Sequence, residues 1–295
     1  MNKKYNFLLF FFWAFFNCKT VIFYEKQELD SLSIDLYKTN SNSKILMIHL
    51  DPLTFDKKVF LSHWNPYWLR KGMEMLYVNL PTKKLLEPKE VQIIIKKIKE
   101  NYLIQDKKVI LVGISLGGIP ILDLLNSSEP LESKTVDKIL LIGTGFDYSY
   151  SGNFFKENPE VLNKKIKEIH SKTLLKYKEY LLNQYDPYIV NEFFLPQISL
   201  EKKEIKYITK RNLPLLVVAG KIDSFSPEDT LYNLIKYYSK DTNPSCKIVT
   251  KLNPCYYIEV SRANFFDRDY NHFDLFLYKN VENDLYGEIL DWIYL

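Results

Sequence analysis

A strand-like apolar run that ends directly in Gly-x-Ser-x-Gly constrains the fold of this chain more than any other feature of its sequence. The run Lys108 to Val112 is rich in β-branched residues, which predicts a buried strand, and the helix-compatible run Ile119 to Leu125 follows the motif. A strand, a sharp turn and a helix in this order hold the central serine in a strained backbone conformation. Side chains two positions before and after that serine would collide, so glycine is needed at Gly113 and Gly117. The motif indicates that Ser115 is a nucleophile, against the alternative of a chance match in a loop.

Two segments downstream supply an acid and a histidine in the order that such a serine requires. The apolar run Leu213 to Ala219 predicts a second strand, and Asp223 stands just past the glycine-containing turn at its end. His272, one of four histidines, lies near the C-terminus, ahead of a closing helix expected from about Val281 to Tyr294. Serine, acid and histidine therefore follow one another in the order of a catalytic triad.

These three motifs together resemble those of the α/β-hydrolases, and the resemblance extends over roughly Ile45 to Leu295. The C-terminal sequence Tyr-Asn-His-Phe-Asp-Leu-Phe-Leu, with the later Asp-Leu-Tyr-Gly-Glu-Ile-Leu-Asp-Trp-Ile, is similar to that of the acid lipases and related ester hydrolases. The pattern formed by Gly220, Asp223, Pro227 and Asp229 also fits those enzymes. The resemblance implies an α/β-hydrolase fold, no cofactor, and a serine esterase or lipase that cleaves a small-molecule or lipid ester.

The resemblance further implies that Ser115 is the nucleophile, Asp223 the acid and His272 the base. A serine hydroxyl is a poor nucleophile at neutral pH, so an imidazole must take its proton, and a carboxylate must hold that imidazole in the right tautomer. Asp147, just beyond another expected strand, is an alternative acid, because some members of the fold place it there. A turn-capping role for Asp223 and a surface position for His272 are the non-catalytic alternatives. Asp274 is expected to support the histidine loop.

The oxyanion hole is where the sequence departs from the pattern. Its two backbone N–H donors should come from Leu116, the residue after the nucleophile, and from the turn after the first long core strand. Most relatives have His-Gly at this strand end, where this chain has His49-Leu50, so the conformational freedom of glycine is missing. The amide of Leu50 or Asp51 is the expected second donor, since Pro52 has no N–H. His49 itself is expected to be structural because it ends a buried strand.

The first residues of the chain predict export. Lys3 and Lys4 precede an unbroken apolar run, Phe7 to Phe16, which is too short to span a bilayer of about 30 Å and is typical of a secretory signal. Cys18 resembles the site at which bacterial lipoproteins are cleaved and acylated. We therefore expect a signal peptide over residues 1–17 and a lipoprotein anchored in the cell envelope through Cys18. An uncleaved anchor and a secreted or periplasmic protein are the alternatives.

Residues 18–295 are enough for one large α/β domain. A net charge of +4 from 40 basic and 36 acidic residues is weak, and no basic patch is interleaved with aromatic residues, so we expect no nucleic-acid partner. No spacing of cysteine and histidine indicates a metal site. Cys246 starts an expected strand and Cys255 follows it, so their extended separation argues against a disulfide unless the chain folds back.

Strand and helix patterns alternate along the chain, which predicts a mostly parallel sheet with helices on both faces. The expected strands are Ser31–Tyr37, Lys44–His49, Met75–Asn79, Lys108–Gly113, Val136–Gly143, Leu213–Ala219 and Lys247–Leu252. The expected helices are Val59–Lys71, Pro88–Tyr102, Leu116–Leu125 and Pro227–Tyr238. A segment of about 146–211, rich in aromatic residues and lysine, interrupts the pattern and is expected to form an inserted helical cap over the active site.

Two other functions fit the same sequence. An acyltransferase would use the same three residues, and a non-catalytic surface lipoprotein would keep the fold for binding alone. The leucine at position 50 favours the binding protein, because the usual glycine is missing there. The complete set of Ser115, Asp223 and His272 favours the ester hydrolase, because a binding protein has no chemical need for all three.

Overall fold

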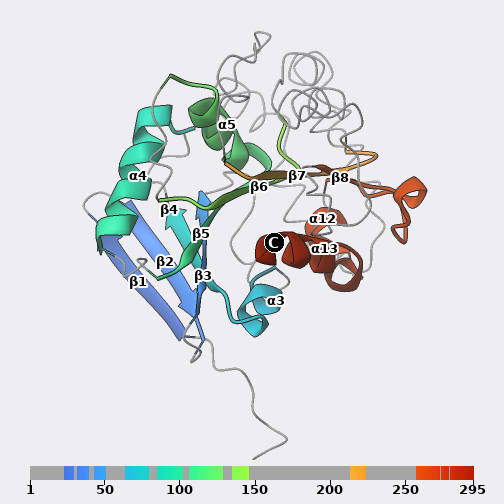
Figure 1. Cartoon of the computed structure of the whole chain (residues 1–295), viewed down its shortest axis with the longest axis horizontal. Helices are drawn as coiled ribbons and strands as arrows, with labels where there is room; N and C mark the ends of the chain where they lie inside the picture. The colour runs from blue at the N-terminus through green and yellow to red at the C-terminus, as the bar shows by residue number, and fades with distance from the viewer. Residues whose placement is uncertain are drawn as a thin grey trace, which may run out of the picture.

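A single sheet of eight strands organises the chain (Figure 1). The computed structural model describes residues 23–29, 32–39, 43–50, 64–79, 85–101, 106–128, 135–145, 213–223, 257–272, 274–278 and 280–295. In these ranges the strands are β1 (Phe23–Leu29), β2 (Leu32–Lys38), β3 (Ile45–Leu50), β4 (Glu74–Asn79), β5 (Lys108–Ile114), β6 (Lys138–Ile142), β7 (Leu215–Gly220) and β8 (Tyr257–Val260). Their order in the sheet is β1-β2-β4-β3-β5-β6-β7-β8. Strands β4, β3 and β5 to β8 are parallel, while β2 is antiparallel to both β1 and β4.

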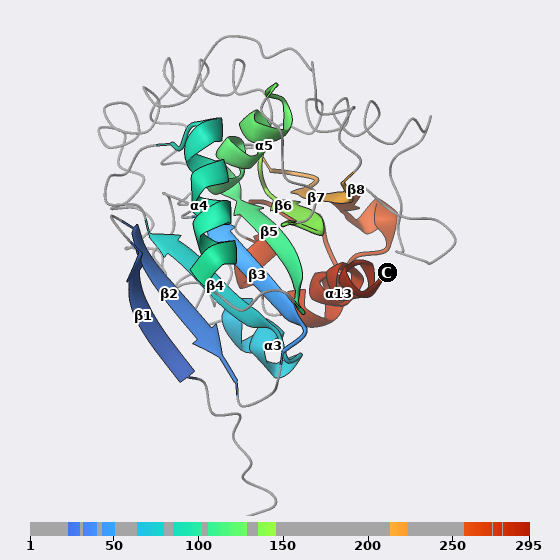
Figure 2. The ribbon, with the colours of Figure 1, turned by 60° about the vertical axis from the view of Figure 1, so that its left-hand side comes forward.

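Helices cover both faces of this sheet (Figures 1 and 2). The described helices are α3 (Trp64–Arg70), α4 (Pro88–Asn101), α5 (Ile119–Leu125), α12 (Asp274–Leu277) and α13 (Gly287–Tyr294). Short turns of other helix types are η1 (Ser115–Gly118), η5 (Arg262–Asn264) and η6 (Glu282–Tyr286). Helices α4 and α5 pack on one face, and α3, α12 and α13 pack on the other. The sheet is therefore enclosed between two helical layers.

The alternation of side chains along each strand builds two separate cores. In β5, Val109 and Leu111 belong to the core beneath α4 and α5, while Ile110 and Val112 belong to the core beneath α3 and α13. All four side chains are at most 2% exposed. A strand buried on both faces needs a nearly continuous apolar sequence, which explains why the sequence reveals the central strands so clearly.

The predicted fold class is confirmed, and the differences lie in the two edge strands and at the starts of two helices. Strands β1 and β8 were not predicted, because β1 is rich in charged residues and β8 has only four residues. The helix expected to begin at Leu116 starts instead as the turn η1, and the closing helix includes the π-type turn η6. The expected strand at 247–252, the helix at 227–238, the cap at 146–211 and the signal peptide lie outside the described residues.

Candidate active site

The turn between β5 and α5 holds Ser115 in a left-handed backbone conformation. Its φ is 52°, a region that residues other than glycine rarely occupy. The strand and helix on either side approach each other so closely that a Cβ on Gly113 would lie 2.4 Å from the Cα of Gly118. The strained turn expected from the sequence is therefore present, and the close approach that requires glycine at position 113 is made to Gly118.

Thr144, which follows β6, packs behind this turn. Its side chain is fully buried, and its hydroxyl donates a hydrogen bond to the carbonyl oxygen of Ser115 at 3.0 Å. A Cβ on Gly118 would lie 2.3 Å from the same hydroxyl oxygen, so threonine fills the space beside the turn. The contact ties the strained backbone of Ser115 to the neighbouring strand. Sequence reasoning missed this residue, although it follows directly on the expected strand.

Three of the residues singled out in the sequence lie in one hydrogen-bonded line. The Oγ of Ser115 is 2.9 Å from Nε2 of His272, and Nδ1 of the same ring is 2.8 Å from Oδ2 of Asp223. The three residues are buried, at 6%, 2% and 6% exposure. They come from different elements: the turn after β5, the loop before α12 and the turn after β7. All three therefore meet at the carboxyl edge of the parallel strands, where ligands bind in folds of this class.

A glycine after β6 makes room for the imidazole of His272. Gly143 has a φ of +58°, and a Cβ there would lie 3.0 Å from Cε1 and 3.1 Å from Nδ1 of the ring. Both the backbone conformation and the contact therefore require glycine. The ring of Phe276 on α12 makes an edge-to-face contact with the imidazole, at a centroid distance of 6.5 Å.

The loop that carries His272 is held by a reciprocal pair of hydrogen bonds. The backbone N–H of Asn271 donates to Asp274 at 3.1 Å, and the backbone N–H of Asp274 donates to the side chain of Asn271 at 2.9 Å. Burial raises the pKa of Asp274, whereas the bond from Asn271 and the charge of Arg268, 3.6 Å away, oppose that shift. Asp274 thus braces the histidine loop, in line with the supporting role expected for it.

The strand end at His49 and Leu50 lies beside the serine turn. His49 is level with Val112 of β5, so Leu50 comes one residue further toward the turn that bears Ser115. The imidazole of His49 is buried, accepts a hydrogen bond from the indole of Trp64 at 2.9 Å and stacks on Tyr77 at 4.4 Å. Burial lowers the pKa of His49 to about 3, so the ring is neutral and structural.

The fold recurs in solved structures. A membrane phospholipase A, described as a bacterial virulence factor, matches with a TM-score of 0.62 at 14% identity, over 98% of this chain and 92% of that one. A 2-hydroxy-6-oxo-6-phenylhexa-2,4-dienoate hydrolase from Rhodococcus sp. strain RHA1 matches with a TM-score of 0.60 at 13% identity, over 94% and 99%. A thermophilic esterase matches with a TM-score of 0.55 at 15% identity, over 92% and 99%.

The chain has the α/β-hydrolase fold. At these identities the comparison shows the fold alone. No protein-family profile matches the sequence, and no curated protein matches it either.

Several residues singled out in the sequence lie outside the described part of the chain. These are the alternative acid Asp147, the alternative amide of Asp51, the acylation site Cys18, and the cysteines at 246 and 255. Among the described residues, no three His, Cys, Asp or Glu side chains are grouped to hold a metal ion. None of the helices described combines the length and the apolar character needed to cross a membrane.

Proposed function

We propose that this protein is a serine hydrolase that cleaves carboxylic esters through Ser115, His272 and Asp223. The observation that supports the proposal is the continuous hydrogen-bonded line from the Ser115 hydroxyl through both ring nitrogens of His272 to Asp223. Geometry of this kind prepares a serine for attack on an acyl carbon. The fold shared with a phospholipase and an esterase points in the same direction.

Each residue has one role in the proposed reaction. Nε2 of His272 takes the proton of Ser115 as the serine oxygen attacks the ester carbonyl carbon, and then gives that proton to the departing alcohol. Asp223 accepts the hydrogen bond from Nδ1, which fixes the tautomer and stabilises the imidazolium. Water, activated by the same imidazole, then cleaves the acyl-enzyme and releases the carboxylic acid and the free serine.

The negative oxygen of the tetrahedral intermediate needs two N–H donors. We assign them to the backbone amides of Leu116, which follows the nucleophile in η1, and of Leu50, the last residue of β3. The strained φ of Ser115 supports the first assignment, because this turn is the one that directs the next amide toward the substrate. The register of β3 beside β5 supports the second.

For localisation, we propose an exported protein acylated at Cys18 and held at the membrane of the cell envelope. The lysines and apolar run ahead of Cys18 support this proposal. The substrate is then a small-molecule or lipid ester met at or outside that membrane.

A fluorophosphonate probe tests the proposed chemistry directly. The probe should label the purified protein, and Ser115→Ala should abolish the label while leaving the circular dichroism spectrum unchanged. A folded wild-type protein that stays unlabelled would favour the binding protein instead. A labelled protein that transfers acyl groups to an added alcohol faster than to water would favour the acyltransferase.

A further inference from the structure

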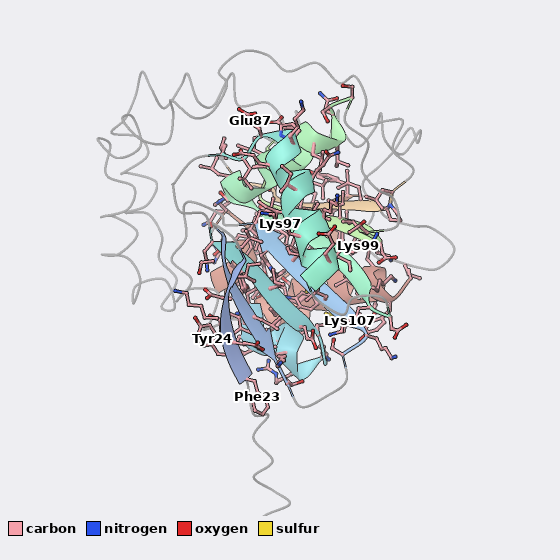
Figure 3. All side chains as sticks on the ribbon, turned by 90° about the vertical axis from the view of Figure 1, so that its left-hand side faces the viewer. Phe23, Tyr24, Glu87, Lys97, Lys99 and Lys107 are labelled. Carbon is pink, nitrogen blue, oxygen red and sulfur yellow. The ribbon has the colours of Figure 1, made fainter. Side chains whose placement is uncertain are left out.

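The position of the first described strand decides which way the proposed active site faces when the chain is tethered at a membrane. Phe23, the first residue of β1, pairs with Lys38 of β2, and Tyr37 beside it pairs with Met75 of β4. Phe23 is therefore level with Glu74, the first residue of β4, at the amino edge of the parallel strands. Figure 3 shows Phe23 and Glu87, which leads into α4, at opposite ends of this side of the molecule.

The strand register also gives the distance from this edge to the nucleophile. Glu74 pairs with Leu46 and Leu46 with Val109, so Phe23 is level with Val109 of β5. Ser115 comes six residues later, about 20 Å along the strand direction. Four strand spacings from β1 to β5 add about 19 Å sideways, which places Ser115 about 28 Å from Phe23.

The tether, the segment that joins Cys18 to Phe23 at the amino edge, is shorter than the distance from Phe23 to Ser115. From Cys18 to Phe23 there are five residue steps, which span at most about 17 Å when fully extended. If the carboxyl edge faced the bilayer, Phe23 would stand up to about 20 Å above the membrane surface, the length of the strand less the part that the twist of the sheet takes away. A chain acylated at Cys18 would therefore need a nearly fully extended tether to turn its carboxyl edge, where Ser115 lies, onto its own bilayer.

The amino edge carries side chains that suit a lipid surface. Phe23 is 43% exposed, whereas Tyr24, 55% exposed, donates its hydroxyl to Asp35 and therefore points along the sheet and not out of this edge. Tyr294, 61% exposed, lies at the same edge, because Lys108 at the start of β5 donates to the carbonyl of the neighbouring Ile293 at 2.7 Å. Aromatic side chains of this kind are favoured at the boundary between membrane and water.

Charge and exposed apolar side chains occur at both edges, so the tether is what distinguishes them. The amino edge has exposed Lys44 but also exposed Asp106, so we assign its affinity to the tether and the aromatic side chains. At the carboxyl edge the strongly exposed Phe265 and Ile222 lie near Asp267 and Asp269 and also near Arg262 and Arg268, so the charges there balance.

We propose that the amino edge docks on the membrane and that the active site faces the aqueous side. This inference rests on the proposed hydrolase function and on acylation at Cys18. The substrate of the tethered enzyme is then an ester that reaches it from water, dissolved or carried, and not an ester lipid of the bilayer that holds the enzyme.

The orientation is measured without any need for catalysis. The full acylated chain, with p-azidophenylalanine replacing Phe23 or Phe265 and bearing a clicked fluorophore, is reconstituted in phosphatidylcholine–phosphatidylglycerol vesicles that contain spin-labelled lipid. We expect quenching several-fold stronger at position 23 than at position 265. Equal quenching, stronger quenching at 265, or a chain that does not bind the vesicles would overturn the proposal.

A longer tether tests the consequence for substrates. About 20 Gly and Ser residues inserted after Thr20 add roughly 25 Å of flexible chain. With a fluorogenic ester lipid in the same vesicle, we expect the extended chain to act at least tenfold faster than the wild type, and both to cleave soluble p-nitrophenyl butyrate equally. A wild type that cleaves the lipid as fast as the extended chain would overturn the inference. Loss of all ester cleavage in both chains would instead contradict the hydrolase function, and the quenching result would stand by itself.

Discussion

The carboxylate of Asp223 lies 2.8 Å from Nδ1 of His272, although 49 positions separate the two residues along the chain. The pair leaves Nε2 of the same ring 2.9 Å from the hydroxyl of Ser115. Asp223 is therefore the carboxylate placed to set the histidine tautomer, and this can be tested against the alternative acid Asp147.

Replacing each carboxylate by its amide separates the two candidates. Asp223→Asn should lower kcat about 10⁴-fold, because an amide favours the wrong imidazole tautomer while preserving the shape of the site. Asp147→Asn is the matched control and should stay within a few-fold of the wild type. Steady-state kinetics on a soluble ester measures both, and a larger loss in the Asp147 variant would transfer the role of the acid to that residue.

The hydroxyl of Thr144 should matter for the rate through the backbone of Ser115. Thr144→Val keeps the shape of the side chain but removes the donor to the Ser115 carbonyl, which leaves a buried acceptor without this partner. We expect kcat to fall about tenfold with KM unchanged, the equivalent of about 1.4 kcal/mol. Thr144→Ser retains the hydroxyl and should restore kcat, so equal rates in the valine variant and the wild type would contradict this role.

A single methyl group at position 143 should displace the imidazole of His272. Gly143→Ala combines a left-handed φ with a Cβ only 3.0 Å from the ring of His272. We expect kcat/KM to fall about 100-fold, the order of loss that a displacement of 1 Å produces. Gly287→Ala is the matched control, because nothing lies within 4 Å of a Cβ there. Its activity should remain at the wild-type level, and similar losses in both variants would show that His272 is not the cause.

Acid should destabilise the protein through His49. Burial lowers the pKa of His49 from 6.5 to about 3, so between these values the unfolded chain binds a proton that the folded chain does not. This contribution to stability is complete above pH 6.5 and is lost as the pH falls, by about 3 kcal/mol at pH 4. Urea unfolding at a series of pH values measures it. His49→Asn should be less stable at pH 7 but show a shallower slope below pH 6.5, and an unchanged slope would assign the acid sensitivity elsewhere.

Loss of the thiol at position 18 should release the protein from the membrane. Cys18→Ala removes the group that would be acylated, so the chain should move from the membrane fraction to the soluble fraction with its turnover of a soluble ester intact. Fractionation and mass spectrometry of the mature chain measure this. Retention of the variant in the membrane fraction would indicate an uncleaved anchor.

The sequence predicted the central strands because they are buried on both faces and therefore consist of nearly continuous apolar residues. Strand β5 and its neighbours β3 and β6 are recognisable in this way, whereas β1 is not. As an edge strand, β1 has one neighbour and carries charged residues such as Glu25 and Lys26, so it has no apolar pattern to recognise. Its position depends on pairing with β2, which only the tertiary structure shows.

For the site, the sequence by itself determined the residue types, their order and the turn that presents Ser115. These are local properties, since a serine between glycines at a strand end is strained wherever that strand lies. Only the tertiary structure decided that His272, 157 positions from Ser115, meets it at hydrogen-bonding distance. It also decided that Gly143 and Thr144 serve the site, since their roles come from space and contacts shared with distant residues. The pattern of residues along the chain indicates which of them are buried. The distances between residues on different strands depend on how the whole sheet packs.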